Sequence, residues 1–197
     1  FTQKTAYEML RSLVGSEMCI RDRVYTIPNK LWWIKDFLDD DMYKGIHDAI
    51  IKERSKLNLK TSEGVWDARL HRNLKAPDRV QVSQYPPFEL LKEKVRNNAF
   101  FKMPIVQEMT TTIHYMKNKS GINWHSDNSW EYGATYYINR RWNIHWGGEF
   151  MFADDAAHGF LPITGNSLVI VKAPLDHKVN PVLSPIMPRI SVQMFMK

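Results

Sequence analysis

The stretch GINWHSDNSWEYGATYYIN, residues 121–139, carries the feature on which the fold assignment depends. His125 and Asp127 are separated by one residue and lie among aromatic and strand-forming residues. On a β-strand, residues i and i+2 point to the same face, so this imidazole and this carboxylate would converge on one point. Such convergence suits a metal ion, although two neighbouring polar residues on a surface give the same pattern.

The overall composition indicates one ordinary globular domain. The chain has 197 residues, of which 44% are hydrophobic and 24% charged. Its net charge of +6 comes without a Lys/Arg block, so nucleic acid is not an expected partner. The single cysteine, Cys19, excludes an internal disulfide framework, and no apolar run is long enough to span a bilayer. We therefore expect a cytoplasmic protein with no membrane partner; the oligomeric state is left open.

Residues 1–23 differ in character from the rest of the chain. The string SLVGSEMCIRDR resembles a translated sequencing-adapter read-through, and no signal-peptide pattern is present. We expect this segment to be non-native or disordered, although its apolar residues also follow the spacing of an ordinary helix. Residues 24–197 are then expected to form a single domain.

Helical and strand patterns occupy different halves of this domain. Residues 41–56 show helical spacing at the end of a run of aspartates that offers N-cap oxygens. Residues 86–101 show the same spacing and open with two prolines, which suit the first turn of a helix. After residue 104 the chain reads as short strands broken by Gly, Pro, Asn and Asp. The pattern predicts an α+β, mainly β protein, with helical support in 24–103 and a sandwich, jelly-roll or barrel core in 104–197.

Two further residues give the His-x-Asp pair a chemical context. His177 opens a short strand some fifty residues later, which completes a set of two histidines and one carboxylate with His125 and Asp127. Such a set binds divalent iron on one face and leaves other positions open. Arg189 and Ser191 share one face of the last strand, where a guanidinium and a hydroxyl can bind a carboxylate.

The motifs HSDN, YYIN, GGEF, HKVNPV and PRIS follow one another in this order. Together they resemble the iron(II)/2-oxoglutarate-dependent dioxygenase superfamily, and within it the prolyl 4-hydroxylase-like group. Ser191 departs from the closest prolyl hydroxylases and is more like other branches of the superfamily. The resemblance implies a double-stranded β-helix, or jelly-roll, for the C-terminal half.

The resemblance also implies roles for particular residues. His125, Asp127 and His177 would be the catalytic iron ligands, and four residues would bind the co-substrate: Arg189, Ser191, Tyr115 and Tyr137. Fe(II), 2-oxoglutarate and O2 are the expected cofactors and co-substrates, with ascorbate as an additional candidate. If Tyr115 faces the pocket, its strand neighbour His114 faces away, so we expect His114 to be structural.

The implied activity is hydroxylation of a substrate C–H bond with release of succinate and CO2. A peptidyl proline is the first candidate substrate, by resemblance; a free amino acid, another small molecule or a nucleic-acid base are alternatives. A protein of a different class, a non-catalytic jelly-roll binding module, would leave the order of the motifs unexplained. Residues 73–87 are a candidate for a loop that covers the substrate, or a plain connector.

Overall fold

A computed structural model of the chain describes most of the domain. The described residues are 24–54, 58–61, 70, 72–82, 85–98, 108–155 and 158–197. Residues 1–23 lie outside them, so the expectation for that segment stays a prediction.

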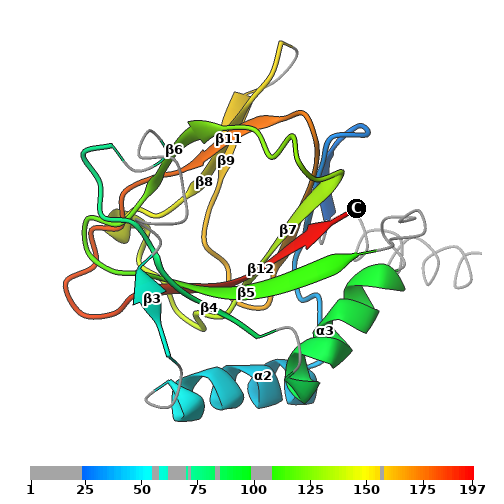
Figure 1. Cartoon of the computed structure of the whole chain (residues 1–197), viewed down its shortest axis with the longest axis vertical. Helices are drawn as coiled ribbons and strands as arrows, with labels where there is room; N and C mark the ends of the chain where they lie inside the picture. Colours follow the sequence, from blue (N-terminus) through cyan, green and yellow to red (C-terminus); the bar gives the residue numbers. More distant parts are fainter. Residues whose placement is uncertain are drawn as a thin grey trace, which may run out of the picture.

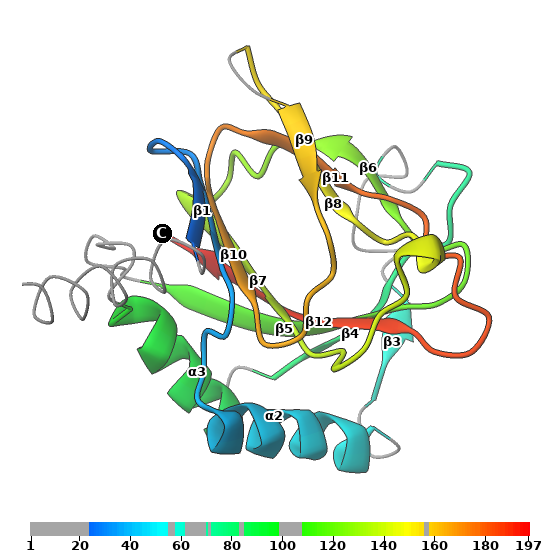
Figure 2. The same cartoon turned by 180° about the vertical axis from the view of Figure 1, so that it is seen from behind.

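The strands of the described residues form two antiparallel sheets that face each other, as a jelly-roll requires (Figures 1 and 2). The larger sheet has eight strands, in the order β1 (Val24–Ile27), β2 (Leu31–Ile34), β10 (Leu168–Lys172), β7 (Tyr132–Tyr137), β12 (Arg189–Met196), β5 (Met109–Met116), β4 (Asp78–Gln81) and β3 (Lys60–Thr61). The smaller sheet has four, in the order β6 (Ile122–His125), β11 (Asp176–Val179), β8 (Phe150–Ala153) and β9 (His158–Leu161). A short 3-10 helix, η3 (Ile144–Trp146), precedes β8. The predicted α+β, mainly β jelly-roll is confirmed.

Both predicted helices form and lie against the outer face of the larger sheet (Figure 1). Helix α2 (Asp40–Glu53) begins after Asp39, whose carboxylate accepts a hydrogen bond from the Met42 amide at 2.8 Å. Helix α3 (Pro86–Arg96) begins with two prolines, which need no hydrogen-bond partner in the first turn. The apolar faces of these helices pack on the sheet and fix its position from one side.

The N-terminal half contributes strands as well as helices. β1 and β2 extend the larger sheet at one edge, and β4 and β3 extend it at the other. Residues 24–103 are therefore not only helical support for a C-terminal sheet. β4 also lies within residues 73–87, where we expected a covering loop or a connector; instead it pairs with β5 over its whole length.

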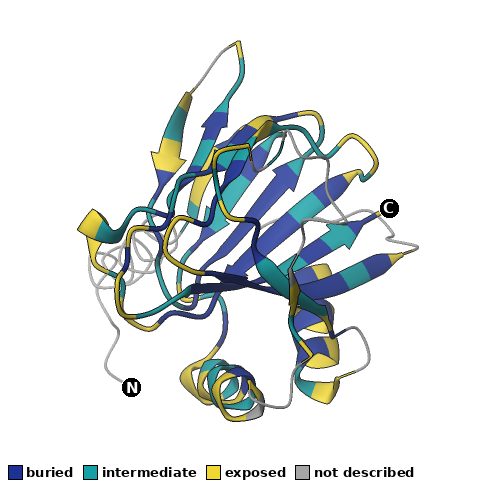
Figure 3. Cartoon of the chain, turned by 60° about the vertical axis from the view of Figure 1, so that its left-hand side comes forward, coloured by how far each residue is buried: buried dark blue, intermediate teal, exposed yellow. Residues whose placement is uncertain are grey.

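Buried apolar side chains fill two separate layers. One cluster lies between the helices and the outer face of the larger sheet, around Ile50, Leu91 and Ile113. Another lies between the two sheets, around Phe152 and Val169. The central strands of the larger sheet, β10, β7, β12 and β5, are buried along most of their length (Figure 3). Within the described part of the chain, the helices are too short or too polar to cross a membrane.

Candidate metal centre

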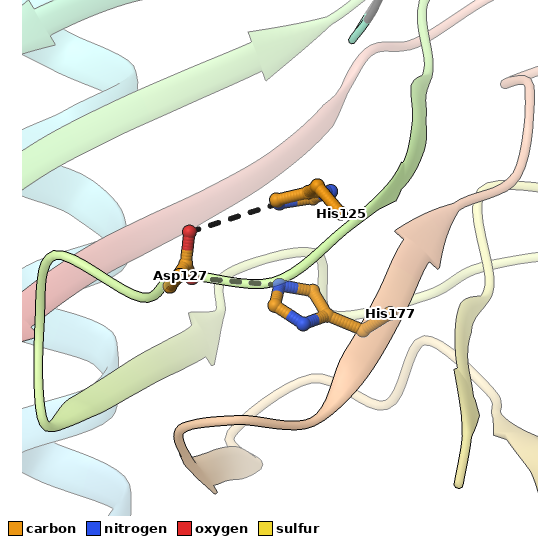
Figure 4. Close-up of side chains that lie close together, drawn as sticks. All are labelled: His125, Asp127 and His177. Carbon is orange, nitrogen blue, oxygen red and sulfur yellow. Dashed lines mark ion pairs between the residues drawn. The ribbon is translucent and has the colours of Figure 1, made fainter.

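The smaller sheet and the loop after it bring the three predicted ligands together (Figure 4). His125 ends β6 and pairs directly with His177 on β11. Asp127 lies past the end of β6, in a turn that the Trp130 amide closes on the Asp127 carbonyl. We expected a strand to place His125 and Asp127 on one face, and this is wrong because the strand ends at His125. The two side chains converge because the turn brings Asp127 back.

The distances between the side chains suit a shared ion. Asp127 Oδ1 lies 3.8 Å from His125 Nε2, and Asp127 Oδ2 lies 3.4 Å from His177 Nε2. One ligand atom from each residue lies within 4.8 Å of the others. Two atoms that each bind an ion at about 2 Å lie no more than about 4 Å apart, and the two distances from Asp127 to the imidazoles satisfy this limit. Among the described residues, no other group of histidine, cysteine and carboxylate side chains converges in this way.

Backbone carbonyls orient both imidazoles. His125 Nδ1 lies 2.8 Å from the Asn123 carbonyl oxygen, and His177 Nδ1 lies 2.8 Å from the Leu175 carbonyl oxygen. Because a carbonyl oxygen only accepts, each Nδ1 carries the proton and donates it. Each Nε2 then keeps its lone pair and points toward Asp127, which is the tautomer that binds a metal.

The electrostatic environment keeps these groups in their metal-binding forms. Burial, with repulsion from His177, lowers the pKa of His125, so its ring is neutral at neutral pH. Burial by itself raises the pKa of Asp127, but His177 and His125 lower it by more, and the carboxyl stays ionised. The ring of Phe150 stacks on His177 with centroids 5.2 Å apart, which covers one side of the site. This donor set fits a divalent ion.

A cavity of about 390 Å³ opens in front of the three ligands. Its volume lies in the range of small-molecule sites, which is about 300–1,000 Å³. Besides the ligands, its wall includes hydrogen-bonding side chains from the inner face of the larger sheet: Arg79, Gln81, Thr110, Thr112, Thr135 and Gln193. Trp130 and Phe195, with ring centroids 5.8 Å apart, add an aromatic section. The cavity thus offers both polar and apolar contacts beside the candidate metal.

Arg189 and Ser191 lie on the inner face of β12, as their spacing predicts. Arg189 is fully buried, and its Nη1 donates to Ser191 Oγ at 3.0 Å. Its Nη2 donates to the Tyr137 hydroxyl at 3.3 Å, and its Nε donates to the Gly148 carbonyl at 3.1 Å. Tyr137 therefore lies beside the guanidinium, and its role in binding a co-substrate stays a prediction.

No carboxylate among the described residues pairs with Arg189. A buried guanidinium without a counter-ion is costly, so this arrangement favours an anionic ligand. Arg189, Ser191 and Tyr137 are not part of the cavity wall, but Gln193 joins the two regions. Gln193 Nε2 donates to Ser191 Oγ at 3.3 Å, and Gln193 Oε1 accepts from Thr135 at 2.8 Å.

The expectation for Tyr115 is wrong. Its ring is buried on the helix side of the sheet, where its hydroxyl lies 3.5 Å from the Ile50 carbonyl and Arg54 stacks over it. His114, which we expected to be structural, lines the cavity instead. Burial first, then Arg189 and Arg79, lowers the pKa of His114 to about 3, so its ring is neutral.

The local alternation of β5 could have corrected this expectation. Thr110, Thr112 and His114 form one set of alternate residues and are all polar, whereas the other set includes Ile113 and Tyr115, with Thr111 as its one polar member. The polar set pairs with Ser191 and Gln193 on β12, which marks it as the inner face. The resemblance implied a role for Tyr115 from its place in the sequence, which does not say to which side of the sheet its side chain points.

The sequence analysis did not identify two residues near the candidate metal centre, Arg79 and Gly133. Arg79 reaches the cavity because β4 joins the sheet, and a single arginine in a short segment of sequence does not reveal this. Gly133 lies behind Asp127, and a Cβ there would come within 3.3 Å of Asp127 Oδ2. A side chain at Gly133 would therefore press on the candidate ligand.

Comparisons with known proteins agree with this geometry. Residues 111–197 match the family model of the 2OG-Fe(II) oxygenase superfamily. No curated protein sequence matches the chain. The resemblance to the iron(II)/2-oxoglutarate-dependent dioxygenases is thus confirmed, and members of that superfamily use Fe(II), 2-oxoglutarate and O2.

Solved structures with the same fold include several prolyl hydroxylases. A prolyl hydroxylase from Trichoplax adhaerens, in complex with a peptide fragment of hypoxia inducible factor, has a TM-score of 0.71 at 15% identity over 99% of this chain and 94% of that one. A Pseudomonas putida prolyl-4-hydroxylase has a TM-score of 0.66 at 12% identity, over 86% and 93% of the two chains. A viral collagen prolyl hydroxylase from Paramecium Bursaria Chlorella virus-1 has a TM-score of 0.59 at 11% identity, over 86% and 96%. At these identities the likeness establishes the fold.

Proposed function

We propose that this protein is an iron(II)- and 2-oxoglutarate-dependent dioxygenase that hydroxylates a substrate C–H bond. The observation that carries the proposal is the convergence of His125, Asp127 and His177, with both Nε2 atoms directed at the carboxylate. Iron held there would supply the O2 chemistry: one oxygen atom enters succinate as 2-oxoglutarate loses CO2, and the other enters the hydroxylated product.

The residues of this chain would hold and orient the reactants. Two imidazoles and one carboxylate leave the remaining iron positions open for the co-substrate and O2. Arg189 would bind the distal carboxylate of 2-oxoglutarate, with the hydroxyls of Ser191 and Tyr137 as further donors. Burial raises the pKa of the Tyr137 hydroxyl, partly offset by Arg189, so it stays protonated and able to donate. Phe150 would limit water access beside His177.

The substrate is proposed as a peptidyl proline. The support is the prolyl hydroxylase character of the similar structures, one of which holds a peptide. The second candidate is a free amino acid or another small molecule. This second candidate is favoured by the size of the cavity, about 390 Å³, and by the positively charged side chain of Arg79 in its wall.

A two-stage experiment tests this function. The apo-protein is first titrated anaerobically with Fe(II) and followed by calorimetry, which measures binding without turnover. The iron-loaded protein is then given 2-oxoglutarate and O2, and succinate is measured with and without panels of peptides and amino acids scanned for a product heavier by one oxygen atom. Iron binding followed by succinate formation is expected; a protein that neither binds Fe(II) nor forms succinate contradicts the proposal and favours a non-catalytic binding module.

A further inference from the structure

Arg79 is a cationic side chain in the cavity wall that the proposed iron and 2-oxoglutarate chemistry does not use. It lies on β4, directly opposite His114 on β5, and the same row of the sheet continues through Ser191 to Tyr137. Arg79 is partly buried and lines the cavity together with the three candidate ligands. Its guanidinium therefore faces the space that a substrate would occupy.

No acidic side chain among the described residues offsets the charge of Arg79. Among the residues that the structure describes, none forms an ion pair with it. The carboxylate next to it in sequence, Asp78, lies 2.6 Å from the ammonium group of Lys117. Of the described residues in the cavity wall, Asp127 alone is a carboxylate, and it belongs to the candidate metal centre.

The charges in the loaded site would leave one positive charge in excess. Fe(II) contributes two positive charges, and Arg189 and Arg79 contribute one each. Asp127 contributes one negative charge and 2-oxoglutarate contributes two. His114, His125 and His177 add none, because the last two bind iron as neutral rings and His114 is uncharged at neutral pH. One further negative charge would balance this excess, which partly buried surroundings favour.

The surroundings of Arg79 provide space for an anionic group. A second hollow, of about 380 Å³, shares Arg79, Gln81 and Thr112 with the first. It also includes Lys60, an exposed residue of β3 directly opposite Arg79. Positive charge thus extends from the cavity to the edge of the larger sheet, and the amide and hydroxyl groups beside it can accept or donate hydrogen bonds.

We propose that the substrate of this enzyme carries a carboxylate and that Arg79 binds it, with Lys60 farther out along the same row. This inference rests on the proposed dioxygenase function. A planar guanidinium suits a carboxylate because it can donate two parallel hydrogen bonds. The carboxylate could belong to a free amino acid or to an acidic peptide, and Arg79 would be a residue that determines specificity.

The test compares acids with their neutral amides on the full chain loaded with Fe(II). The panel pairs the free L-amino acids with their amides, and peptides that contain Glu or Asp with the Gln or Asn peptides. Succinate formation above the substrate-free rate and the oxygenated product are both measured. Arg79→Gln is compared with Arg96→Gln, which removes an equal charge from an exposed position on α3.

The acids should stimulate wild-type succinate formation more than their amides. Arg79→Gln should raise KM for the preferred acid about ten- to a hundredfold and remove the preference over its amide, because hydrogen bonds to charged groups are the stronger ones. Arg96→Gln should leave KM for the acid and the preference for the acid over its amide unchanged. The amino-acid and peptide arms identify the source of the carboxylate.

The possible failures can be told apart. If the wild type forms no succinate from 2-oxoglutarate, the proposed function fails and this inference fails with it. If succinate forms but the amides stimulate as well as the acids, or no acid stimulates, only this inference is overturned. If Arg79→Gln raises KM for 2-oxoglutarate as much as KM for the acid, Arg79 holds the co-substrate and the inference is also overturned.

Discussion

The two faces of strand β12, in the middle of the larger sheet, carry different kinds of side chain. On β12, Ile190 and Val192 face the helices, whereas Arg189 and Ser191 face the interior between the sheets. All four are at most 4% exposed. Along this strand the outer face packs with α2 and α3, which lie on that side of the sheet (Figure 1). The inner face carries hydrogen-bonded side chains near the candidate metal centre, and only farther along the sheet, around Val169, is the inner face apolar as well.

This difference shows that burial alone does not separate stabilising from functional residues. Burying apolar side chains stabilises a fold, whereas burying polar or charged groups costs free energy unless they are paired. A buried guanidinium with no carboxylate partner among the described residues is therefore better explained by a ligand than by stability. Substitutions on the inner face should change binding and activity, and substitutions on the outer face should change the free energy of unfolding.

The largest effect is expected from Asp127→Ala. Loss of a residue that only supports a metal ligand reduces metal affinity about 10- to 100-fold, so loss of a ligand itself should reduce Fe(II) affinity more than about a thousandfold. Anaerobic titration with Fe(II) measures this, and Asp155→Ala, at an exposed carboxylate, is the matched control. An Asp127→Ala protein that binds Fe(II) and hydroxylates like the wild type would remove Asp127 from the proposed set.

On the outer face, Leu91→Ala should destabilise the fold by about 3 kcal/mol, within the usual range for a buried leucine. Leu91 is fully buried in α3, whereas its neighbour Leu90 is 43% exposed and provides the control. Leu90→Ala should change stability by less than about 0.5 kcal/mol. Urea unfolding measures both variants. Below the unfolding transition, Fe(II) affinity should match the wild type in each, and a large loss in Leu91→Ala would show that the two faces are coupled.

Arg189→Lys should raise KM for 2-oxoglutarate about ten- to a hundredfold. Lysine keeps the charge but loses the fork of donors, and hydrogen bonds to charged groups contribute about 1.5–3 kcal/mol. Ser191→Ala should raise KM less, because a neutral hydroxyl is the weaker partner. Arg141→Lys, at an exposed position, serves as control, and Fe(II) affinity should persist in all three. An unchanged KM in Arg189→Lys would shift the anchoring role to Arg79.

The smallest effect is expected from a pair of glycine substitutions. Gly133→Ala places a methyl group about 3.3 Å from Asp127 Oδ2 and should weaken Fe(II) binding by less than about tenfold, as the carboxylate shifts. Gly45 occupies an exposed position of α2, where a new methyl group would have no neighbour outside its own helix within 4 Å. Gly45→Ala should therefore stabilise the fold by about 0.5–1 kcal/mol and leave Fe(II) affinity unchanged. Calorimetric titration and urea unfolding distinguish the two outcomes. Equal Fe(II) affinity in Gly133→Ala and the wild type would show that Asp127 has room to move.

Local patterns were sufficient for much of the fold. The helical spacing and capping residues of α2 and α3 depend on neighbours a few positions away, so the sequence predicted both helices. The alternation on β12 likewise grouped Arg189 with Ser191, and the order of the motifs singled out His125, Asp127 and His177. These features share a physical basis, because spacing along one element fixes which side chains share a face.

Spacing along each element predicts which side chains share a face, but which face turns inward depends on how the elements pack together. His114 and Tyr115 have opposite directions on β5 whatever the fold, but only pairing with β12 and packing against α2 place His114 in the cavity and Tyr115 in the core. Arg79 reaches the cavity only because β4 joins the sheet, and Asp127 reaches the histidines through a turn. Register and strand pairing depend on contacts between distant residues, and a one-residue change in register turns every side chain to the other face.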